Sequence, residues 1–337
     1  MRSFGHRAAG AFHDQSGIAL FVVLWVMILL AAIAAQFHFS VRHEFKALRN
    51  LKESAEAHYI AEAGLALATL SLLNSSRQPT AAEAEAEGAA WRVNAPVPVV
   101  AYAGGRIGIW IDNEAGRVNL NTADAPLLRL MLGGLDLDEG RMDTIVDSIL
   151  DWRDPDEFHR ASGAESSYYL SLPQPYTSKN ADFDGVEELQ WVKGVTPELY
   201  PHLQERFTAF HDPAAQGRQL RALFRKRSDA GAGRINLNAA PPAVLMALPG
   251  MTEERAAALA DVRRDRDFKS LTEVADLLGA GVFAEMAPYV SLEMSPFYVI
   301  HAEGMVSQSA VRQRIALRIR MDPVAPNGFT VIQRIEG

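Results

Sequence analysis

The N-terminal part of the chain combines an apolar stretch with a long amphipathic pattern. The eighteen residues from Ile18 to Ala35 include no charged residue, proline or glycine. At about 1.5 Å of rise per residue they form a helix of roughly 27 Å, close to the thickness of a bilayer's hydrocarbon core. From Gln36 to Leu73 apolar residues recur at spacings of three and four, with charged residues between them. The pattern predicts one helix over residues 18–74, with residues 18–39 in the membrane.

Three kinds of N-terminal segment fit this stretch. A cleaved secretory signal needs a small-residue cleavage site after the apolar stretch, but here the helical pattern continues. A signal anchor fits the basic residues Arg2 and Arg7, which favour a cytoplasmic N-terminus. A type IV pilin-like signal is cut before the apolar stretch, here between Gly17 and Ile18, and leaves the hydrophobic helix on the mature protein. The small Gly17, the short basic leader 1–17 and the uninterrupted helix favour this third kind.

Strand-like segments lie on both sides of a helical region. Residues 102–111 place β-branched and aromatic side chains around a Gly-Gly turn, which is typical of a β-hairpin. Further segments alternate between apolar and polar residues or are rich in strand formers. The predicted strands are 91–93, 101–112, 296–303, 310–320 and 329–335. The predicted fold is α+β, with an antiparallel sheet formed by residues 75–118 and 292–337 and packed on the long helix.

The region between the strands carries an internal duplication. Gly116-Arg-Val-Asn-Leu-Asn-Thr-Ala123 reappears as Gly233-Arg-Ile-Asn-Leu-Asn-Ala-Ala240, and each copy precedes a proline and a leucine-rich segment. Similar segments begin again at Phe183 and Phe268. Such self-similarity indicates two related helical units of the SAM-like or helix-hairpin-helix-like kind, with the asparagines capping helices and turns. The predicted all-α insertion covers 119–291, with units at about 119–210 and 233–291.

The composition is that of a folded, acidic protein. Of 337 residues, 48% are hydrophobic and 22% are charged, and the formal net charge is −8. This negative balance argues against a general nucleic-acid-binding protein. The chain has no cysteine, which excludes disulfides and thiolate metal sites.

Acidic residues concentrate between residues 151 and 184. Clustered carboxylates need compensation, and a hard cation with six to eight oxygen ligands supplies it. The spacing is not that of an EF-hand, because only Asp154 and Asp156 match its ligand pattern and the loop glycine is missing. Composition alone leaves a metal site and a solvated acidic loop equally open. The charged residues are Asp151, Asp154, Asp156, Glu157, Glu165, Asp182 and Asp184, against Arg153, Arg160 and Lys179.

Two other function classes receive little support. The nine histidines are scattered, and neither His-Glu-x-x-His nor Gly-x-Ser-x-Gly occurs, so we expect no enzyme. The alternative function is a membrane-anchored helix-hairpin-helix protein that binds nucleic acid, because residues 248–259 resemble the hairpin of such modules. The corresponding residues 132–139 of the first unit are acidic, which counts against this alternative.

Taken together, these features resemble the minor pseudopilin K family of type II secretion systems (general secretion pathway protein K). The matching segments are the leader ending at Gly17, the apolar stretch with Leu24-Trp25, the long helix, the paired Gly-Arg-[Val/Ile]-Asn-Leu-Asn segments, Asp151-Trp-Arg-Asp-Pro-Asp156, Gly163-Ala-Glu165 and Val192-Lys-Gly-Val-Thr-Pro197. The resemblance implies a structural protein with a pilin-like fold, anchored by one helix in the inner membrane, with a cytoplasmic N-terminus and a periplasmic globular domain.

The family's assembly route supplies further expectations. A prepilin peptidase cuts after the glycine that is Gly17 here, and the new amine of Ile18 is methylated. The mature protein then leaves the membrane at an inner-membrane secretion platform and enters a short periplasmic pseudopilus. Together with the minor pseudopilins I and J it caps the tip and initiates assembly, and the fibre exports folded proteins across the outer membrane.

One position departs from the general pilin pattern. Most pilin-like proteins have glutamate at the fifth mature position, which is Val22 here, and its carboxylate pairs with the N-terminal amine of an adjacent subunit. Burying that carboxylate without a partner is costly, and a subunit with no neighbour above it gains nothing from it. Val22 therefore fits a tip subunit, and the expected assembly residues are Val22, Leu24 and Trp25.

The resemblance also implies a structural calcium ion in the acidic stretch. The preferred ligands are Asp154, Asp156 and Glu165. Asp151 and Asp182 are additional candidates.

Overall fold

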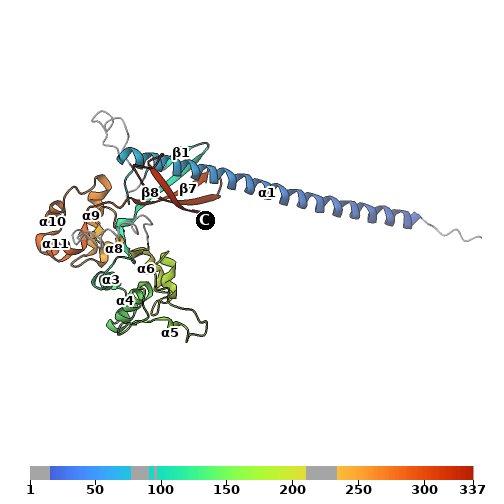
Figure 1. Cartoon of the computed structure of the whole chain (residues 1–337). Coiled ribbons are helices and arrows are strands. Elements are labelled where there is room, and N and C mark those ends of the chain that lie inside the picture. Colours follow the sequence, from blue (N-terminus) through green and yellow to red (C-terminus); the bar gives the residue numbers. More distant parts are fainter. Residues whose placement is uncertain (1–15, 77–90, 95–96, 210–233, 337) are drawn as a thin grey trace, which may run out of the picture. The chain divides into compact units, whose positions relative to one another are not determined.

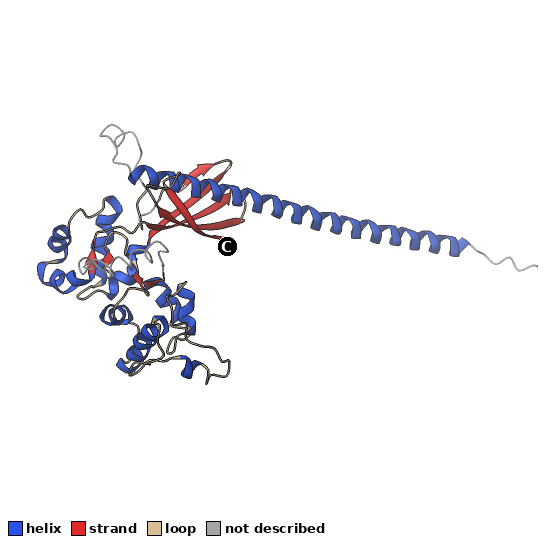
Figure 2. Ribbon diagram, in the orientation of Figure 1, coloured by secondary structure: helices blue, strands red, loops and turns tan. Residues whose placement is uncertain are grey.

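The computed structural model describes residues 16–76, 91–94, 97–209 and 234–336 (Figures 1 and 2). Most of the predicted leader and residues 210–233, at the border of the two predicted helical units, lie outside this part of the chain. The chain divides into two compact units, Met1–Glu56 and Ala57–Gly337. The predicted domain boundaries within the second unit stay predictions.

The first element is one uninterrupted helix, α1 (Ser16–Ser76), as the pattern predicts. No proline occurs in it, and Gly64 is its only glycine after Gly17. The large apolar side chains from Leu20 to Ile33 are exposed. Within the described residues α1 is the one helix that is long and apolar enough to cross a membrane.

Strands from both ends of the globular unit form one antiparallel sheet (Figure 2), which confirms the predicted sheet. Its order is β1-β2-β7-β8-β9. A tight turn at Ala103 and Gly104, both with positive φ, joins β1 to β2. The strands are β1 (Val100–Tyr102), β2 (Gly105–Asn113), β7 (Phe297–Val306), β8 (Arg312–Met321) and β9 (Phe329–Glu336).

The predicted strand at residues 91–93 was wrong. These residues lie in a turn and an irregular segment, and the backbone N–H of Asn94 donates to the carbonyl of Ile111. Trp91 and Val93 pack with the sheet core as a covering segment, so their apolar character reflects burial rather than strand pairing.

The C-terminal part of α1 packs on the sheet through aliphatic side chains from both elements. Fully burying one such side chain stabilises a fold by roughly 1.5–3 kcal/mol. Two glycines allow the close approach. A Cβ on Gly304 would overlap the carbonyl oxygen of Ala57, and one on Gly64 would lie 2.5 Å from Ile107. The buried residues include Ile60, Ala61, Leu65, Ala68, Leu72, Ile107, Ile109, Ile111, Ile300, Ala302, Ile315 and Ile319.

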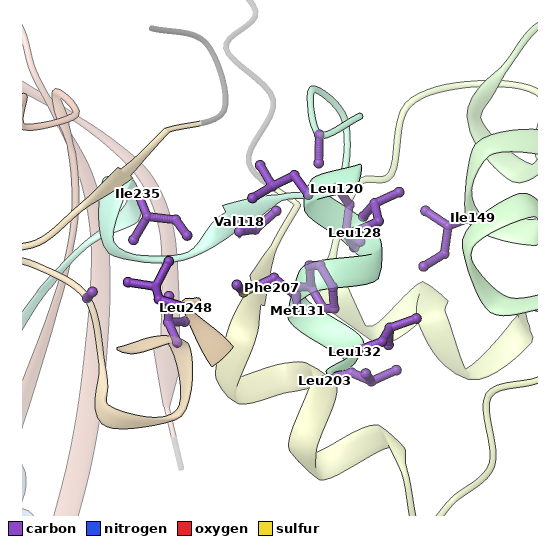
Figure 3. Close-up of a cluster of buried hydrophobic side chains, with 14 of the residues drawn as sticks. Val118, Leu120, Leu128, Met131, Leu132, Ile149, Leu203, Phe207, Ile235 and Leu248 are labelled. Atoms are coloured by element: carbon purple, nitrogen blue, oxygen red, sulfur yellow. The ribbon is translucent and has the colours of Figure 1, made fainter. Parts of the chain in front are cut away.

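Helices dominate the region between β2 and β7. The 3-10 helix η1 (Glu114–Gly116) follows β2 directly. In the first half the helices are α3 (Ala125–Leu132), α4 (Glu139–Arg153), α5 (Ser166–Tyr169), the 3-10 helix η2 (Val186–Trp191) and α6 (Tyr200–Arg206). In the second half they are α8 (Pro242–Ala247), α9 (Glu253–Asp265), α10 (Leu271–Leu278), α11 (Ala280–Met286) and the 3-10 helix η3 (Ala287–Tyr289). Buried side chains from both halves, including Leu128, Phe207, Ile235 and Leu248, form one hydrophobic core (Figure 3).

The expectation that this region holds only helices was wrong in one respect. The first half contains the two-residue parallel pair β3 (Val118–Asn119) and β4 (Phe207–Thr208). The second contains β5 (Ile235–Asn236) and β6 (Val290–Ser291). Each pair joins the start of its half to its end.

The same asparagine contact occurs in both halves. In the first, the side chain of Asn121 donates to the carbonyl of Phe183 (3.0 Å) and accepts from its N–H (2.7 Å). In the second, Asn238 makes the same two bonds with Phe268, at 3.0 and 2.9 Å. The preceding asparagines, Asn119 and Asn236, accept from the backbone N–H two residues later. The repeated motif thus encodes a repeated backbone contact.

Candidate functional site

The acidic stretch is an insertion in the first of the two similar halves. Arg153 donates to the carbonyl of Ala123, and Arg263 donates to the corresponding carbonyl of Ala240. Between Arg153 and Phe183 lie residues 154–182, whereas only residues 264–267 separate Arg263 from Phe268. The second half therefore has no counterpart of the acidic segment, which indicates a role other than completing the repeated unit.

Three of the predicted ligands converge. One carboxylate oxygen from each of Asp154, Asp156 and Glu165 lies within 4.8 Å of the others. Asp154 follows the last residue of α4, and Glu165 precedes the first residue of α5. Asp156 is exposed and accepts a hydrogen bond from the backbone N–H of Phe158 (2.9 Å). Only oxygen ligands meet here, as a hard cation prefers.

Glu165 is a buried carboxylate with one oxygen left unsatisfied by the residues that the structure describes. Its side chain is almost completely buried; Oε2 accepts from the hydroxyl of Ser178 (2.9 Å), but Oε1 has no hydrogen-bond partner among the described residues. Burial raises the pKa of Glu165 to about 7, and the charges of Asp151 and Asp154 contribute to the rise, whereas the bond from Ser178 opposes it. Oδ1 of Asp154 is likewise buried with no hydrogen-bond partner in the described part of the chain. These orphaned oxygens fit a divalent cation.

The other two predicted ligands lie outside the three-residue group. Asp151 is fully buried and accepts from the backbone N–H of Arg160 (3.1 Å) and from its guanidinium (2.5 Å). A Cβ at Gly163 would overlap the carboxylate of Asp151, so this position has no room for a side chain. Asp182 interacts electrostatically with Arg153. Asp151 thus holds the loop together, and Asp182 adds charge nearby.

Arg160 stands out in the sequence only as one of three basic residues in the acidic stretch. In the structure its Nη1 donates to Asp151 and also to Oδ2 of Asp154 (2.6 Å). Burial lowers the pKa of Arg160, but the bonds to Asp154 and Asp151 outweigh it and leave the pKa above its ordinary value. Spacing along the chain gives no signal for this contact, because it depends on how the loop turns back onto α4.

A cluster of aromatic side chains packs in and beside the acidic segment, residues 154–182. Tyr169 is fully buried, with Trp152 edge-on at 5.3 Å and Tyr176 stacked at 5.1 Å. The ammonium group of Lys193 donates to the carbonyls of residues 162 and 163 at 3.2 and 3.0 Å. The tyrosines of this stretch therefore order the loop through ring packing.

The predicted processing and assembly residues lie at the start of α1. Gly17 and Ile18 are in its first turn. Val22, Leu24 and Trp25 are all more than half exposed in the isolated chain. The predicted nucleic-acid hairpin joins α8 to α9, and its Gly250 has a φ of 68°. The roles of these residues in processing, assembly and nucleic-acid binding stay predictions.

Comparison with known proteins identifies two matching segments. Sequence models described as type II secretion system (T2SS), protein K, match residues 111–212 and 235–293. The putative type II secretion system protein K of Escherichia coli (strain K12) is 29% identical over 208 residues, which are 57% of this chain and 61% of that protein. Type II secretion system protein K of Aeromonas hydrophila is 27% identical over 210 residues, 56% of this chain and 62% of that protein.

A shorter alignment and a solved structure complete the comparison. Type II secretion system protein K of Pectobacterium carotovorum subsp. carotovorum is 34% identical over 93 residues, 28% of each chain. The matches thus span less than two thirds of these relatives. A chain in the crystal structure of the GspK-GspI-GspJ complex from enterotoxigenic Escherichia coli shares the fold, with a TM-score of 0.53, 17% identity, and coverage of 88% of this chain and 99% of that one. The protein belongs to the protein K family of type II secretion systems.

Proposed function

We propose that this protein is a minor pseudopilin that caps the tip of a type II secretion pseudopilus and initiates its assembly for the export of folded proteins. The observation that carries the proposal is that α1 is one helix with two environments. Its apolar N-terminal part is exposed, and its C-terminal part is packed in the core of the sheet domain. A helix of this kind suits a subunit that is stored in a membrane and then joins a helix bundle in a fibre.

We infer the protein's partners from the exposed apolar part of α1 and from its relatives. GspK of similar fold forms a complex with GspI and GspJ, which supports minor pseudopilins of types I and J as partners here. Prepilin peptidase cleaves between Gly17 and Ile18, Ile18 is methylated, and the inner-membrane platform extracts the mature protein. The N-terminus is cytoplasmic and the globular domain periplasmic.

Val22 supports the tip rather than the shaft of the fibre. An apolar side chain here needs no amine from a neighbouring subunit above, whereas a carboxylate in the same apolar bundle does. Leu24 and Trp25 lie within the following turn and add apolar contact area for the neighbouring helices.

A calcium ion is proposed as a structural part of the protein. Asp154, Asp156 and Glu165 would hold it, with Asp151 fixing the loop and Asp182 adding negative charge. When bound, calcium supplies positive charge to a cluster with two buried oxygens that have no hydrogen-bond partner among the described residues. Its role would be structural, because it would link Asp154 at the end of α4 to Glu165 at the start of α5.

The proposal is tested by the mature N-terminus of the full chain extracted from membranes of cells with an intact secretion system. Mass spectrometry is expected to show a protein that begins at N-methylated Ile18. A Gly17→Trp variant, whose large side chain blocks the cleavage site, serves as the control and is expected to keep its leader. An intact leader on the unmodified chain would contradict processing as a pseudopilin.

A further inference from the structure

Arg160 occupies an unusual position beside the proposed calcium site. A single nitrogen, Nη1, lies 2.5 Å from Asp151 and 2.6 Å from Oδ2 of Asp154. Asp154 is also one of the three residues whose oxygens converge. Its carboxylate is therefore shared between a resident guanidinium and the position of the proposed ion.

Other nearby cations are directed elsewhere. Lys193 donates to the carbonyls of residues 162 and 163 and lies over the ring of Tyr168, and Arg153 donates to the carbonyls of Leu120 and Ala123. Within the described part of the chain, Arg160 is the cation that forms ion pairs with both Asp151 and Asp154. The cluster thus relies on one guanidinium, while Oε1 of buried Glu165 has no hydrogen-bond partner among the described residues.

We propose that Arg160 is a built-in counter-ion that keeps the acidic loop folded without metal and competes with calcium for Asp154. This inference rests on the proposed calcium site. Two cations that share one carboxylate repel each other, and this repulsion is strong where the surroundings are partly buried. Arg160 therefore lowers the affinity for calcium, and it stabilises the fold of the acidic loop when no calcium is bound.

The test uses the full chain in detergent and the variants Arg160→Gln and Arg141→Gln. Glutamine removes the charge of Arg160 but keeps the backbone N–H that binds Asp151. Arg141 is an exposed residue near the opposite end of α4, so its variant controls for the loss of one positive charge. Calcium affinity is measured by calorimetric titration, and melting temperature is measured with chelator and with saturating calcium.

The expected result is that Arg160→Gln binds calcium at least about fivefold more tightly than the unmodified chain, the lower end of ordinary coupling between two sites. Its melting temperature with chelator is lower, and calcium reduces the difference. Arg141→Gln matches the unmodified chain. Equal or weaker calcium binding by Arg160→Gln, with normal binding by the unmodified chain, would overturn the role of Arg160 alone. No binding by any of the proteins would overturn the calcium site as well.

A second variant keeps the test decisive if Arg160→Gln does not fold. Arg160→Lys keeps the charge but loses the planar fork of donors, so it holds Asp154 less firmly. Its calcium affinity is expected to be higher than that of the unmodified chain and lower than that of a folded Arg160→Gln. An affinity below that of the unmodified chain would contradict competition.

Discussion

At the scale of single residues, the proposed calcium site depends on carboxylates that differ in burial. Glu165 is buried, Asp154 is partly buried and Asp156 is exposed. A cation bound here is expected to contribute most through the buried oxygens, because they have lost water and gained no other partner among the described residues. Asp156 completes the set from the solvent side and is the safest residue to change without disturbing the core.

Asp156→Asn is expected to weaken calcium binding by about tenfold or more, which corresponds to roughly 1.4 kcal/mol. The matched control is Asp184→Asn, an exposed acid of the same insertion that pairs with Lys179. Calorimetric titration measures both, and a larger loss in the control would refute this choice of ligands. In the presence of chelator the two variants are expected to have similar melting temperatures.

Asp112 provides an acid-dependent contribution to stability. Burial by itself raises its pKa, but contact with His301, the charge of Arg117 and a hydrogen bond from Trp110 outweigh burial and hold the pKa below its ordinary value. A carboxylate with a lowered pKa stabilises the folded state above its ordinary pKa, and this contribution is lost as pH falls through the lowered value.

The free energy of unfolding is therefore expected to fall as the pH drops below about 4, the ordinary range of an aspartate. Asp112→Asn removes this part of the pH dependence, so the variant is less stable at neutral pH but declines less on acidification. Urea unfolding at several pH values measures both. If the free energy of unfolding of the two proteins changed with pH in parallel, ionised Asp112 would not be the source of this pH dependence.

At the level of single residues, the sequence identified candidate ligands, and their role in binding a metal stays a prediction. Asp154, Asp156 and Glu165 follow from a family resemblance, and the fold brings their oxygens together. Arg160 and Ser178 were missed as partners because their contacts join loop positions whose separation depends on the path of the chain. Composition cannot supply that path.

At the scale of secondary-structure elements, the junction of α1 with the sheet depends on small residues. Gly304 lies against the helix backbone at Ala57 and Ala61. A methyl group added at Gly108, on the neighbouring strand, would meet its nearest neighbour, Met305, at 3.7 Å, which is an ordinary van der Waals distance. The two glycines therefore differ in their tolerance of an added side chain.

Gly304→Ala is expected to destabilise the fold by roughly 1–3 kcal/mol, because the added methyl group forces the helix away from the sheet. Gly108→Ala is the control and is expected to change stability by less than about 0.5 kcal/mol. Thermal or urea unfolding compares them. Equal effects would show that α1 does not pack on the sheet at Gly304.

The repeated asparagine contact gives a second prediction for the elements. Asn238→Ala leaves the buried backbone N–H and carbonyl of Phe268 without their partner, so it is expected to cost about 1–3 kcal/mol. Asn121→Ala acts on Phe183 in the same way. The exposed Asn327 provides the control Asn327→Ala, with a change below about 0.5 kcal/mol. Urea unfolding that fails to separate Asn238 from Asn327 would argue against a structural role for the repeated motif.

Element prediction from the sequence was strongest for long patterns. The helix α1 and the long strands β2, β7, β8 and β9 follow sustained periodicity. The two-residue strands β3 to β6 were missed, because a pair so short has no period and is defined by its distant partner. Residues 91–93 were assigned to a strand because apolar residues in a covering segment resemble a short buried strand.

At the scale of the whole molecule, the buried side chains of the described residues form two separate hydrophobic cores. One core joins the C-terminal part of α1 to the sheet, and the other lies within the helical region that carries the acidic insertion. Assembly through α1 is therefore expected to be insensitive to changes in the calcium loop that leave both cores intact. The duplication in the sequence indicates a separate helical region, but it does not reveal that both repeated halves share one core.

Assembly with other minor pseudopilins through α1 is the central property inferred for this protein. The most direct test is native mass spectrometry of the full chain co-expressed with the I- and J-type minor pseudopilins of its own secretion system and extracted in mild detergent. We expect a complex that contains all three proteins and persists in Asp184→Asn. A chain that is recovered alone, or bound only to copies of itself while its two partners associate without it, would contradict this inference.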